Sequence, residues 1–381
     1  MNVFPNIPKV FNGKFPADFV NDVDGFGFSA EELAENKGRL LTLDIDITPG
    51  ELCSLRCPQC FSHNGTIDEK AGTPLSYKEM YDVIKDGKKL GLASVKLLGR
   101  GEHTENPALL TFVQILNDLG LATLIFTKGH VIGDDDAVKR IYGHHYGIKT
   151  GRQLAERLYG LNTRILLGCR TFDPEKEDKI VGMKGYSAKR NWAMELLVKA
   201  GFTQHNPTFL GLITNPVVKN TLDDVVKVYD FGKERNMYVC VAPTMVSGRG
   251  RKSSSTAPSR EQLIRLYTKI YEWNIMHGVQ TLAQIREEGI SPYAGSRPCS
   301  LPASGLYVSY YGDVYMSEGN DGAEFNYGNV RHKPLKEIWE QSRNFKEFAG
   351  KANCGCPAKD GITIPKDLYR TVLDNLTKKF S

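Results

Sequence analysis

The sequence predicts an α/β protein, a partial (β/α)6 TIM-type barrel followed by a small C-terminal α+β unit. Three observations predict this class. The chain has 381 residues, which is more than one small core requires. Strand patterns alternate with amphipathic helical patterns through the first two thirds of the chain. A polar, Ser-rich break then precedes a shorter unit with hairpin signals. The predicted parts are an N-terminal extension (1–38), the barrel (39–250), a linker and helix (251–298) and the C-terminal unit (299–381).

The composition is that of an ordinary globular protein. Hydrophobic residues make up 41% and charged residues 24% of the chain, so disorder is not expected. A solvated surface explains the net charge of +5, and a nucleic-acid partner is not expected. No apolar run reaches the ~18 residues of a membrane span, and the first residues lack a signal-peptide pattern. We therefore expect a cytoplasmic protein without a membrane partner, whose reduced cysteines serve metal binding or catalysis.

A cluster of cysteines follows the first predicted strand. Residues 39–48 alternate apolar and polar side chains, which is typical of a strand. Cys53, Cys57 and Cys60 come next with the spacing C-x3-C-x2-C, and residues 76–92 have apolar side chains at helical spacing. α/β barrels keep their chemistry in the loops at the C-terminal ends of their strands. This loop is therefore the first candidate site.

Two kinds of metal site fit three cysteines in eight positions, whereas a catalytic thiolate does not need three. Zinc takes four ligands in a closed tetrahedron, and His63, two residues beyond Cys60, is a candidate for the fourth. An iron–sulfur cube also takes four ligands. With three cysteines it would keep one iron open for a substrate or cofactor.

A glycine-rich loop follows the second predicted strand, ASVKLL. The stretch LLGRGEHTENP (97–107) contains Gly99, Gly101 and Glu102. Glycines let the backbone approach a ligand closely, and a carboxylate beside them can accept hydrogen bonds from a charged amino group. Taken alone, the stretch is more typical of a turn with a solvated acid than of a ligand site.

The cysteine spacing and the glycine-rich Gly-Glu stretch, in this order, resemble the radical S-adenosylmethionine (radical SAM) superfamily. The resemblance implies that Cys53, Cys57 and Cys60 hold a [4Fe-4S] cluster. It implies that the amino and carboxylate groups of SAM chelate the fourth iron. It also implies that Glu102, with the two glycines before it, holds the methionine amino group of SAM.

The later strands continue the resemblance. Residues 121–129 resemble the third barrel strand, with Thr127 at the cofactor and Lys128 where the family often has Asn. Residues 209–245 resemble strand five, a helix and strand six. Asn215, which ends strand five, stands where the family often contacts SAM.

The fourth unit lies between these stretches. Residues 164–202 supply a strand, a loop and a helix, and we expect that helix to begin near Ser187 and to stop at Gly201. The third crossover, residues 130–163, looks enlarged. Its pair His144–His145 is interpreted as a surface pair, with a metal site as the alternative.

Two positions depart from the family pattern. Gln59 stands before the third cysteine, where the family usually has an aromatic residue near the adenine. Phe61, just after Cys60, is the expected substitute. Strand four ends GCRTFD instead of Ser-Leu-Asp, so contacts to the ribose from that position are not assumed.

The C-terminal unit resembles the SPASM or twitch extension of radical SAM enzymes, which holds auxiliary iron–sulfur clusters. Cys299, Cys354 and Cys356 match ligand positions, but Ser317 stands where a cysteine is usual and the final pair is spaced C-x-C. We expect one auxiliary iron–sulfur cluster on these three cysteines. The fourth ligand would be Ser317, another side chain, water or substrate. The alternative is that the extension has lost its cluster.

Two further cysteines lie in predicted barrel strands. Cys169 and Cys240 are interpreted as buried core thiols. Cys169, near the mouth of the barrel, has the alternative role of a hydrogen donor.

The resemblance implies an enzyme of the radical SAM oxidoreductase or maturase type. Such an enzyme cleaves SAM reductively to a 5′-deoxyadenosyl radical, which abstracts a substrate hydrogen, and a flavodoxin- or ferredoxin-type protein supplies the electron. The preferred substrate is a ribosomal peptide. The alternative is oxidation of a sugar, cyclitol or nucleotide-derived small molecule, and the non-enzyme alternative is a zinc-stabilised binding protein.

Overall fold

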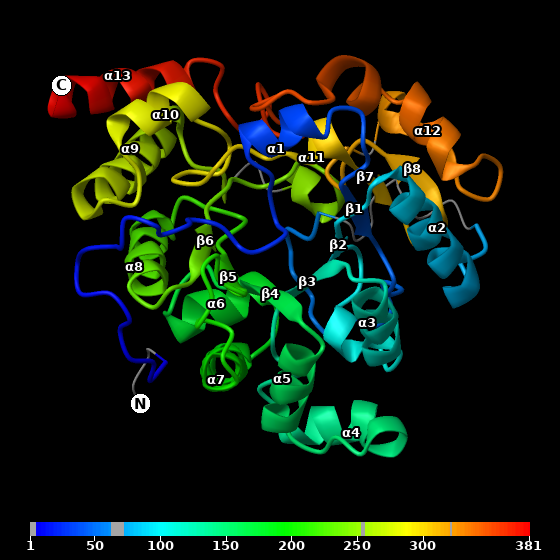
Figure 1. The fold of residues 1–381 in the computed structure, drawn as a ribbon. Coiled ribbons are helices and arrows are strands. Elements are labelled where there is room, and N and C mark those ends of the chain that lie inside the picture. Colours follow the sequence, from blue (N-terminus) through cyan, green and yellow to red (C-terminus); the bar gives the residue numbers. More distant parts are fainter. Residues whose placement is uncertain (1–4, 62–71, 253–255, 321) are drawn as a thin grey trace.

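One mixed sheet organises the molecule (Figure 1). The computed structural model describes residues 5–61, 72–252, 256–320 and 322–381, and within them the sheet has the strand order β6-β5-β4-β3-β2-β1-β7-β8-β9. Neighbouring strands from β6 to β7 run parallel, and β8 and β9 complete an antiparallel meander. The strands are β1 (Thr42–Ile45), β2 (Ser94–Leu97), β3 (Ala122–Thr127), β4 (Thr163–Gly168), β5 (Leu210–Ile213), β6 (Tyr238–Cys240), β7 (Gly305–Val308), β8 (Asp313–Tyr315) and β9 (Asn326–Asn329).

Helices connect the parallel strands and cover one face of the sheet (Figure 1). The crossover after β3 carries two helices, so this part of the chain is enlarged as predicted. The barrel helices are α2 (Tyr77–Leu90), α3 (Leu109–Asp118), α4 (Asp135–Tyr146), α5 (Gly151–Gly160), α6 (Pro174–Val181), α7 (Tyr186–Lys199) and α8 (Leu222–Lys233). The others are α1 (Ala30–Glu35), α9 (Arg260–His277), α10 (Leu282–Glu288), α11 (Leu301–Ser304), α12 (Leu335–Gln341) and α13 (Leu368–Phe380). No described helix is both long enough and apolar enough to cross a membrane.

The strands have two buried faces, as expected for parallel strands with helices on one side. Along β6, Val239 belongs to the main core under the helices, whereas Tyr238 and Cys240 belong to a smaller cluster on the other face, inside the partial barrel. We call that inner side the lumen. Leu124 of β3 and Leu166 of β4 lie in the same small cluster. The alternation of side chains along each strand thus decides which residues can reach a site in the lumen.

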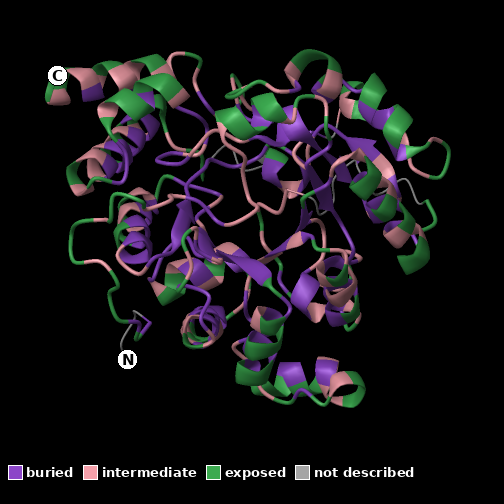
Figure 2. Cartoon of the chain, in the orientation of Figure 1, coloured by how far each residue is buried: buried purple, intermediate pink, exposed green. Residues whose placement is uncertain are grey.

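The N-terminal segment fills part of the lumen. Val23 forms an isolated bridge with Thr208, and the ring of Phe26 lies 5.5 Å from that of Tyr238 and 6.3 Å from that of Phe126. Most of the residues coloured as buried in Figure 2 lie in the sheet and on the inner faces of the helices. The N-terminal segment therefore belongs to the packing of the barrel.

Helix α7 begins near Ser187, as predicted, but Ser187 does not cap it. Its N-cap residue is Gly185, and Ser187 lies inside the first turn. Asp178 supplies the capping interactions: its Oδ2 accepts from Gly185 N at 2.5 Å, and its Oδ1 accepts from Ser187 N at 2.8 Å. An acceptor from the preceding helix satisfies the orphan N–H groups at this helix end.

Candidate active site

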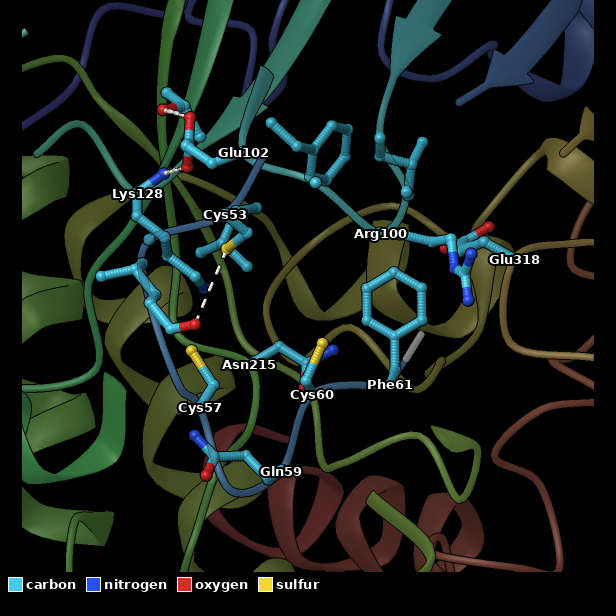
Figure 3. A pocket seen from close by; sticks show the side chains of 18 of the residues that line it. Cys53, Cys57, Gln59, Cys60, Phe61, Arg100, Glu102, Lys128, Asn215 and Glu318 are labelled. Carbon is cyan, nitrogen blue, oxygen red and sulfur yellow. Dashed lines mark hydrogen bonds between the residues drawn. The ribbon is translucent and has the colours of Figure 1, made fainter. Parts of the chain in front are cut away.

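A cavity of about 190 Å³ opens at the C-terminal ends of the barrel strands. One water needs roughly 10–15 Å³ of such space, so the cavity accommodates a group of many atoms. Loops that follow several barrel strands form its wall, as barrel chemistry requires. The structure brings to this one cavity every residue that the sequence places at the first cluster or its cofactor: Cys53, Cys57, Cys60, Phe61, Gly99, Gly101, Glu102, Thr127 and Asn215 (Figure 3).

The cysteine loop is held in place from two sides. Leu55 is 2% exposed and packs with Val181 and Tyr186, while the partly buried Cys53 and Cys57 lie against the same cluster. The C-terminal end of α6 adds hydrogen bonds, because Arg56 N donates to Val181 O at 3.0 Å and the Gln59 side chain donates to Ile180 O at 2.8 Å. The three thiols are therefore presented by a braced loop.

On the other side, the loop after β2 holds the start of the cysteine loop. Glu102 N donates to Leu52 O at 2.9 Å, and Glu105 accepts from Ser54 N at 2.8 Å. Burial, together with the nearby charge of Glu102, raises the pKa of Cys53 to about 12. The free thiol is therefore protonated at neutral pH, and a bound metal would have to displace that proton.

The three thiols line one cavity of about 190 Å³. Across the described residues, no three His, Cys, Asp or Glu side chains converge on the position of one metal ion. His63, the candidate fourth ligand for zinc, lies outside the described residues.

The two glycines are required by packing between loops. A Cβ on Gly99 would lie 2.1 Å from Asp46 Cγ, and a Cβ on Gly101 would lie 2.3 Å from Thr48 Cγ2. The loop after β2 thus lies directly on the loop after β1. The expected close approach occurs, but to the neighbouring loop, and it sets the position of Glu102.

Glu102 is 3% exposed and its carboxylate is fixed by four donors. Oε1 accepts from Thr104 N at 3.2 Å, from Thr104 Oγ1 at 2.7 Å and from Thr127 Oγ1 at 2.5 Å. Among the described residues, Oε2 accepts only from Lys128 N, at 2.8 Å. Since each carboxylate oxygen has two lone pairs, Oε2 keeps room for one more donor. Thr127 therefore lies at the cavity as a partner of Glu102.

Sequence reasoning missed Arg100, Lys128 and Glu318 as members of this wall. The ammonium of Lys128 and the guanidinium of Arg170 both lie against Gly168. A Cβ built on Gly168 would be 3.1 Å from Lys128 Nζ and 3.2 Å from Arg170 Nη1, so the two cations are neighbours. Burial lowers the pKa of Lys128, and the charge of Arg170 lowers it further. The only sequence signal for Lys128 was that it replaces the Asn of the family pattern. Arg100 and Glu318 also line the cavity, and both are labelled in Figure 3.

A second cavity lies deeper, on the lumen side, and shares part of its wall with the first. Cys299, Cys356 and Ser317 line it, as does Cys240 of β6. The hydroxyl of Ser317 donates to Asn320 Oδ1 at 2.6 Å. Cys354 is not part of this wall: its Sγ lies 3.1 Å from Lys351 O, and its side chain packs with Leu33, Leu41 and Ala303. The structure thus does not bring together the three C-terminal cysteines that the sequence grouped.

Comparison with known proteins gives one matching family model. Residues 299–357 match the SPASM domain, described as an iron–sulfur cluster-binding domain. The chain is 23% identical over 345 residues to an AdoMet-dependent heme synthase of Methanosarcina barkeri, which covers 84% of this chain and 88% of that protein. It is 24% identical over 305 residues to a PqqA peptide cyclase of Rhizobium meliloti, covering 78% of this chain and 73% of that protein.

Solved structures share the fold. Native anSMEcpe with bound AdoMet superimposes with a TM-score of 0.61 at 16% identity, over 89% of this chain and 97% of that one. SuiB of Streptococcus suis bound to the precursor peptide SuiA gives a TM-score of 0.57 at 16% identity, over 84% and 72%. The predicted α/β partial barrel with a C-terminal extension is confirmed. These findings support the predicted radical SAM enzyme with a SPASM-type extension, and they support an iron–sulfur cluster and S-adenosylmethionine as its cofactors.

Proposed function

We propose that the chain is a radical SAM enzyme that removes a hydrogen atom from a peptide substrate. Cys53, Cys57 and Cys60 hold the [4Fe-4S] cluster in this proposal. One observation carries it: these three thiols and Glu102 face a single cavity at the C-terminal ends of the barrel strands. When bound there and given an electron by a flavodoxin- or ferredoxin-type donor, the cluster with SAM supplies a carbon radical that abstracts hydrogen.

The chain's own residues bind and orient the cofactor. Oε2 of Glu102 is the acceptor with a free lone pair, so it takes the methionine amino group. Phe61 supplies an apolar ring beside Cys60, in place of the aromatic residue that Gln59 replaces (Figure 3). Asn215 adds an amide at the end of β5. The glycine loop holds Glu102 in place, and the buried walls keep water away from the radical.

A peptide is the favoured substrate. The PqqA peptide cyclase and the SuiB complex with a precursor peptide support a peptide substrate, since each of them matches most of this chain. The heme synthase, with the highest coverage among the curated relatives named above, favours the alternative of a small molecule as substrate. Whether the enzyme is an oxidoreductase or a maturase depends on which substrate enters the cavity.

Formation of 5′-deoxyadenosine tests the reaction class. The anaerobically reconstituted protein, given SAM and a reductant, should release 5′-deoxyadenosine. Cys57→Ala should reduce this at least ~10²-fold while the far-ultraviolet circular dichroism spectrum stays unchanged, because one cluster ligand is lost and the fold is not. Normal cleavage of SAM by Cys57→Ala would contradict the assignment of the cluster.

Co-expression tests the substrate class. Short peptides encoded beside the gene should show a mass change by mass spectrometry when they are expressed with the parent protein. They should show no mass change when they are expressed with Cys57→Ala. A substrate that stimulates 5′-deoxyadenosine release but is a tetrapyrrole, sugar or nucleotide would instead support the small-molecule alternative.

A further inference from the structure

The second cavity combines three thiols from distant parts of the sequence. Cys240 ends strand β6, Cys299 precedes α11, and Cys356 lies in the loop before α13. Cys240 is 3% exposed, and its place on the lumen face follows from the alternation with Val239. The cavity has a volume of about 70 Å³, several times the roughly 10–15 Å³ that one water needs.

Two buried lysines face these thiols. Lys359 is 0% exposed, and its Nζ has no hydrogen-bond partner among the described residues. Its nearest described aromatic contact is the ring of Tyr293, whose centroid lies 5.4 Å away and which lines the cavity. Lys96, 4% exposed, reaches Asp44 at 3.5 Å. A buried ammonium without a partner is costly, so a negative group beside Lys359 would stabilise the fold.

A bound cluster would supply that charge. The charge of Lys359 acts on Cys240 and Cys356, and the charge of Lys96 acts on Cys299. An iron–sulfur cluster with its thiolates is an anionic group of several atoms, which suits both the volume and the lysines.

Glu318 offers a fourth ligand. It lies in the walls of both cavities, and its Oε2 is buried without a hydrogen-bond partner among the described residues. Ser317, the neighbour that the sequence suggested, already donates its hydroxyl proton to Asn320. A carboxylate oxygen without a donor is the better candidate.

We propose that Cys240, Cys299 and Cys356, with Glu318 as the fourth ligand, hold an auxiliary iron–sulfur cluster in the second cavity. Cys354 lies outside this ligand set, because its thiol faces Lys351 O and Phe348 O. Lys359 is the counter-charge of the cluster. The proposal replaces the C-x-C pair by a ligand set that joins the barrel to the C-terminal extension. It does not depend on what the first cluster does.

Iron content in a chain without the first cluster tests the ligand set. The variant Cys53→Ala/Cys57→Ala/Cys60→Ala, reconstituted without oxygen, should keep roughly two to four iron atoms with a Mössbauer spectrum of an iron–sulfur cluster. Adding Cys240→Ser should remove this iron. The matched control, adding Cys354→Ser, should leave it unchanged. An iron-free or zinc-loaded triple variant would overturn the proposal, and so would iron loss on Cys354→Ser with retention on Cys240→Ser.

Two variants keep the test valid if Cys240→Ser does not fold. Glu318→Gln in the triple variant should keep the iron but change the electron paramagnetic resonance signal of the reduced cluster. Lys359→Met should lower the midpoint potential of the cluster, because a positive charge that stabilises the reduced form is lost. An identical signal would exclude Glu318 as ligand, and an unchanged potential would exclude Lys359 as counter-charge. Because the triple variant lacks the first cluster, these results are independent of the 5′-deoxyadenosine test.

Discussion

Glu102 is held in one orientation by four donors, and this orientation determines what it can bind. Three of the donors occupy Oε1, and a backbone N–H occupies one position on Oε2. A cationic amino group can add to Oε2 without displacing any of them. The carboxylate is therefore preorganised for its ligand, and little reorganisation is needed on binding.

Glu102→Gln tests this residue directly. The amide removes the negative charge and turns an N–H₂ group toward Thr127 or Lys128 N. We expect the dissociation constant for SAM to rise about 10- to 100-fold, since hydrogen bonds to charged groups contribute about 1.5–3 kcal/mol. Anaerobic equilibrium dialysis with labelled SAM measures it. Glu51→Gln, an exposed acid near the same cysteine loop, is the control. An unchanged affinity in a folded Glu102→Gln variant would contradict the role.

At this scale the sequence predicted which residues line the cavity, but not the contacts that require them. The spacing of the cysteines and of Gly-Glu named residues that the fold brings to one cavity. It could not show that Gly99 and Gly101 pack against Asp46 and Thr48, because that contact joins two loops. Cys354 and Cys356 were grouped because both match ligand positions of the SPASM or twitch extension. Gly355 between them has a φ of +73°, and such a turn sends neighbouring side chains in different directions.

At the scale of elements, local patterns located the strands and most helices, since alternation and helical spacing are read along the chain. The N-terminus of α7 lies near Ser187, as predicted, but Ser187 is not its cap, although Ser is a common cap residue. The real acceptor, Asp178, lies in α6, seven residues before Gly185. Cys240 was interpreted as a core thiol. Its alternation with Val239 was visible, but which face of β6 holds a cavity is decided only by the closure of the strands into a partial barrel.

Helix α8 ends on a buried lysine that ties three elements together. Lys233 is 0% exposed, and its ammonium donates to the Asn21 side chain of the N-terminal segment. The rings of Tyr229 and Tyr238 lie 5.3 and 5.2 Å from it. Burial lowers the pKa of Lys233 to about 7, while Asp22 acts in the opposite direction. Burial raises the pKa of Asp22 itself to about 6.

This burial predicts a pH-dependent stability. Between pH 7 and about 10 the unfolded chain keeps the Lys233 proton and the folded chain does not, so this group makes stability rise with pH. Lys233→Met should therefore be more stable than the parent near pH 7. Its advantage should shrink by up to about 1.4 kcal/mol per pH unit above that. Urea unfolding at pH 7, 8 and 9 measures the difference. Lys227→Met, an exposed lysine of the same helix, should show no such trend. A constant difference for Lys233→Met would contradict the burial argument.

At the scale of the molecule, the barrel and the C-terminal extension form one sheet. Strand β7 pairs in parallel with β1, from Thr42 opposite Gly305 to Ile45 opposite Val308. The predicted boundary therefore divides the sequence, but one continuous sheet contains strands from both sides of it. Long-range pairing of this kind cannot be derived from local patterns. It explains how a barrel strand and the extension can contribute to the same cavity.

The two cavities share walls from the barrel and from the turn after β8, so the sites lie side by side in one framework. The shared residues are Phe126, Ile213, Asn215, Met245 and Glu318. The central claim is that the cysteine loop after β1 leaves an iron open toward the first of these cavities.

The electron paramagnetic resonance spectrum of the reduced protein, recorded with and without SAM, tests that claim most directly. We predict that SAM shifts the g values of one cluster signal, and that this signal is absent from Cys57→Ala. A parent spectrum that SAM leaves unchanged, in protein that carries its full iron, would contradict the account.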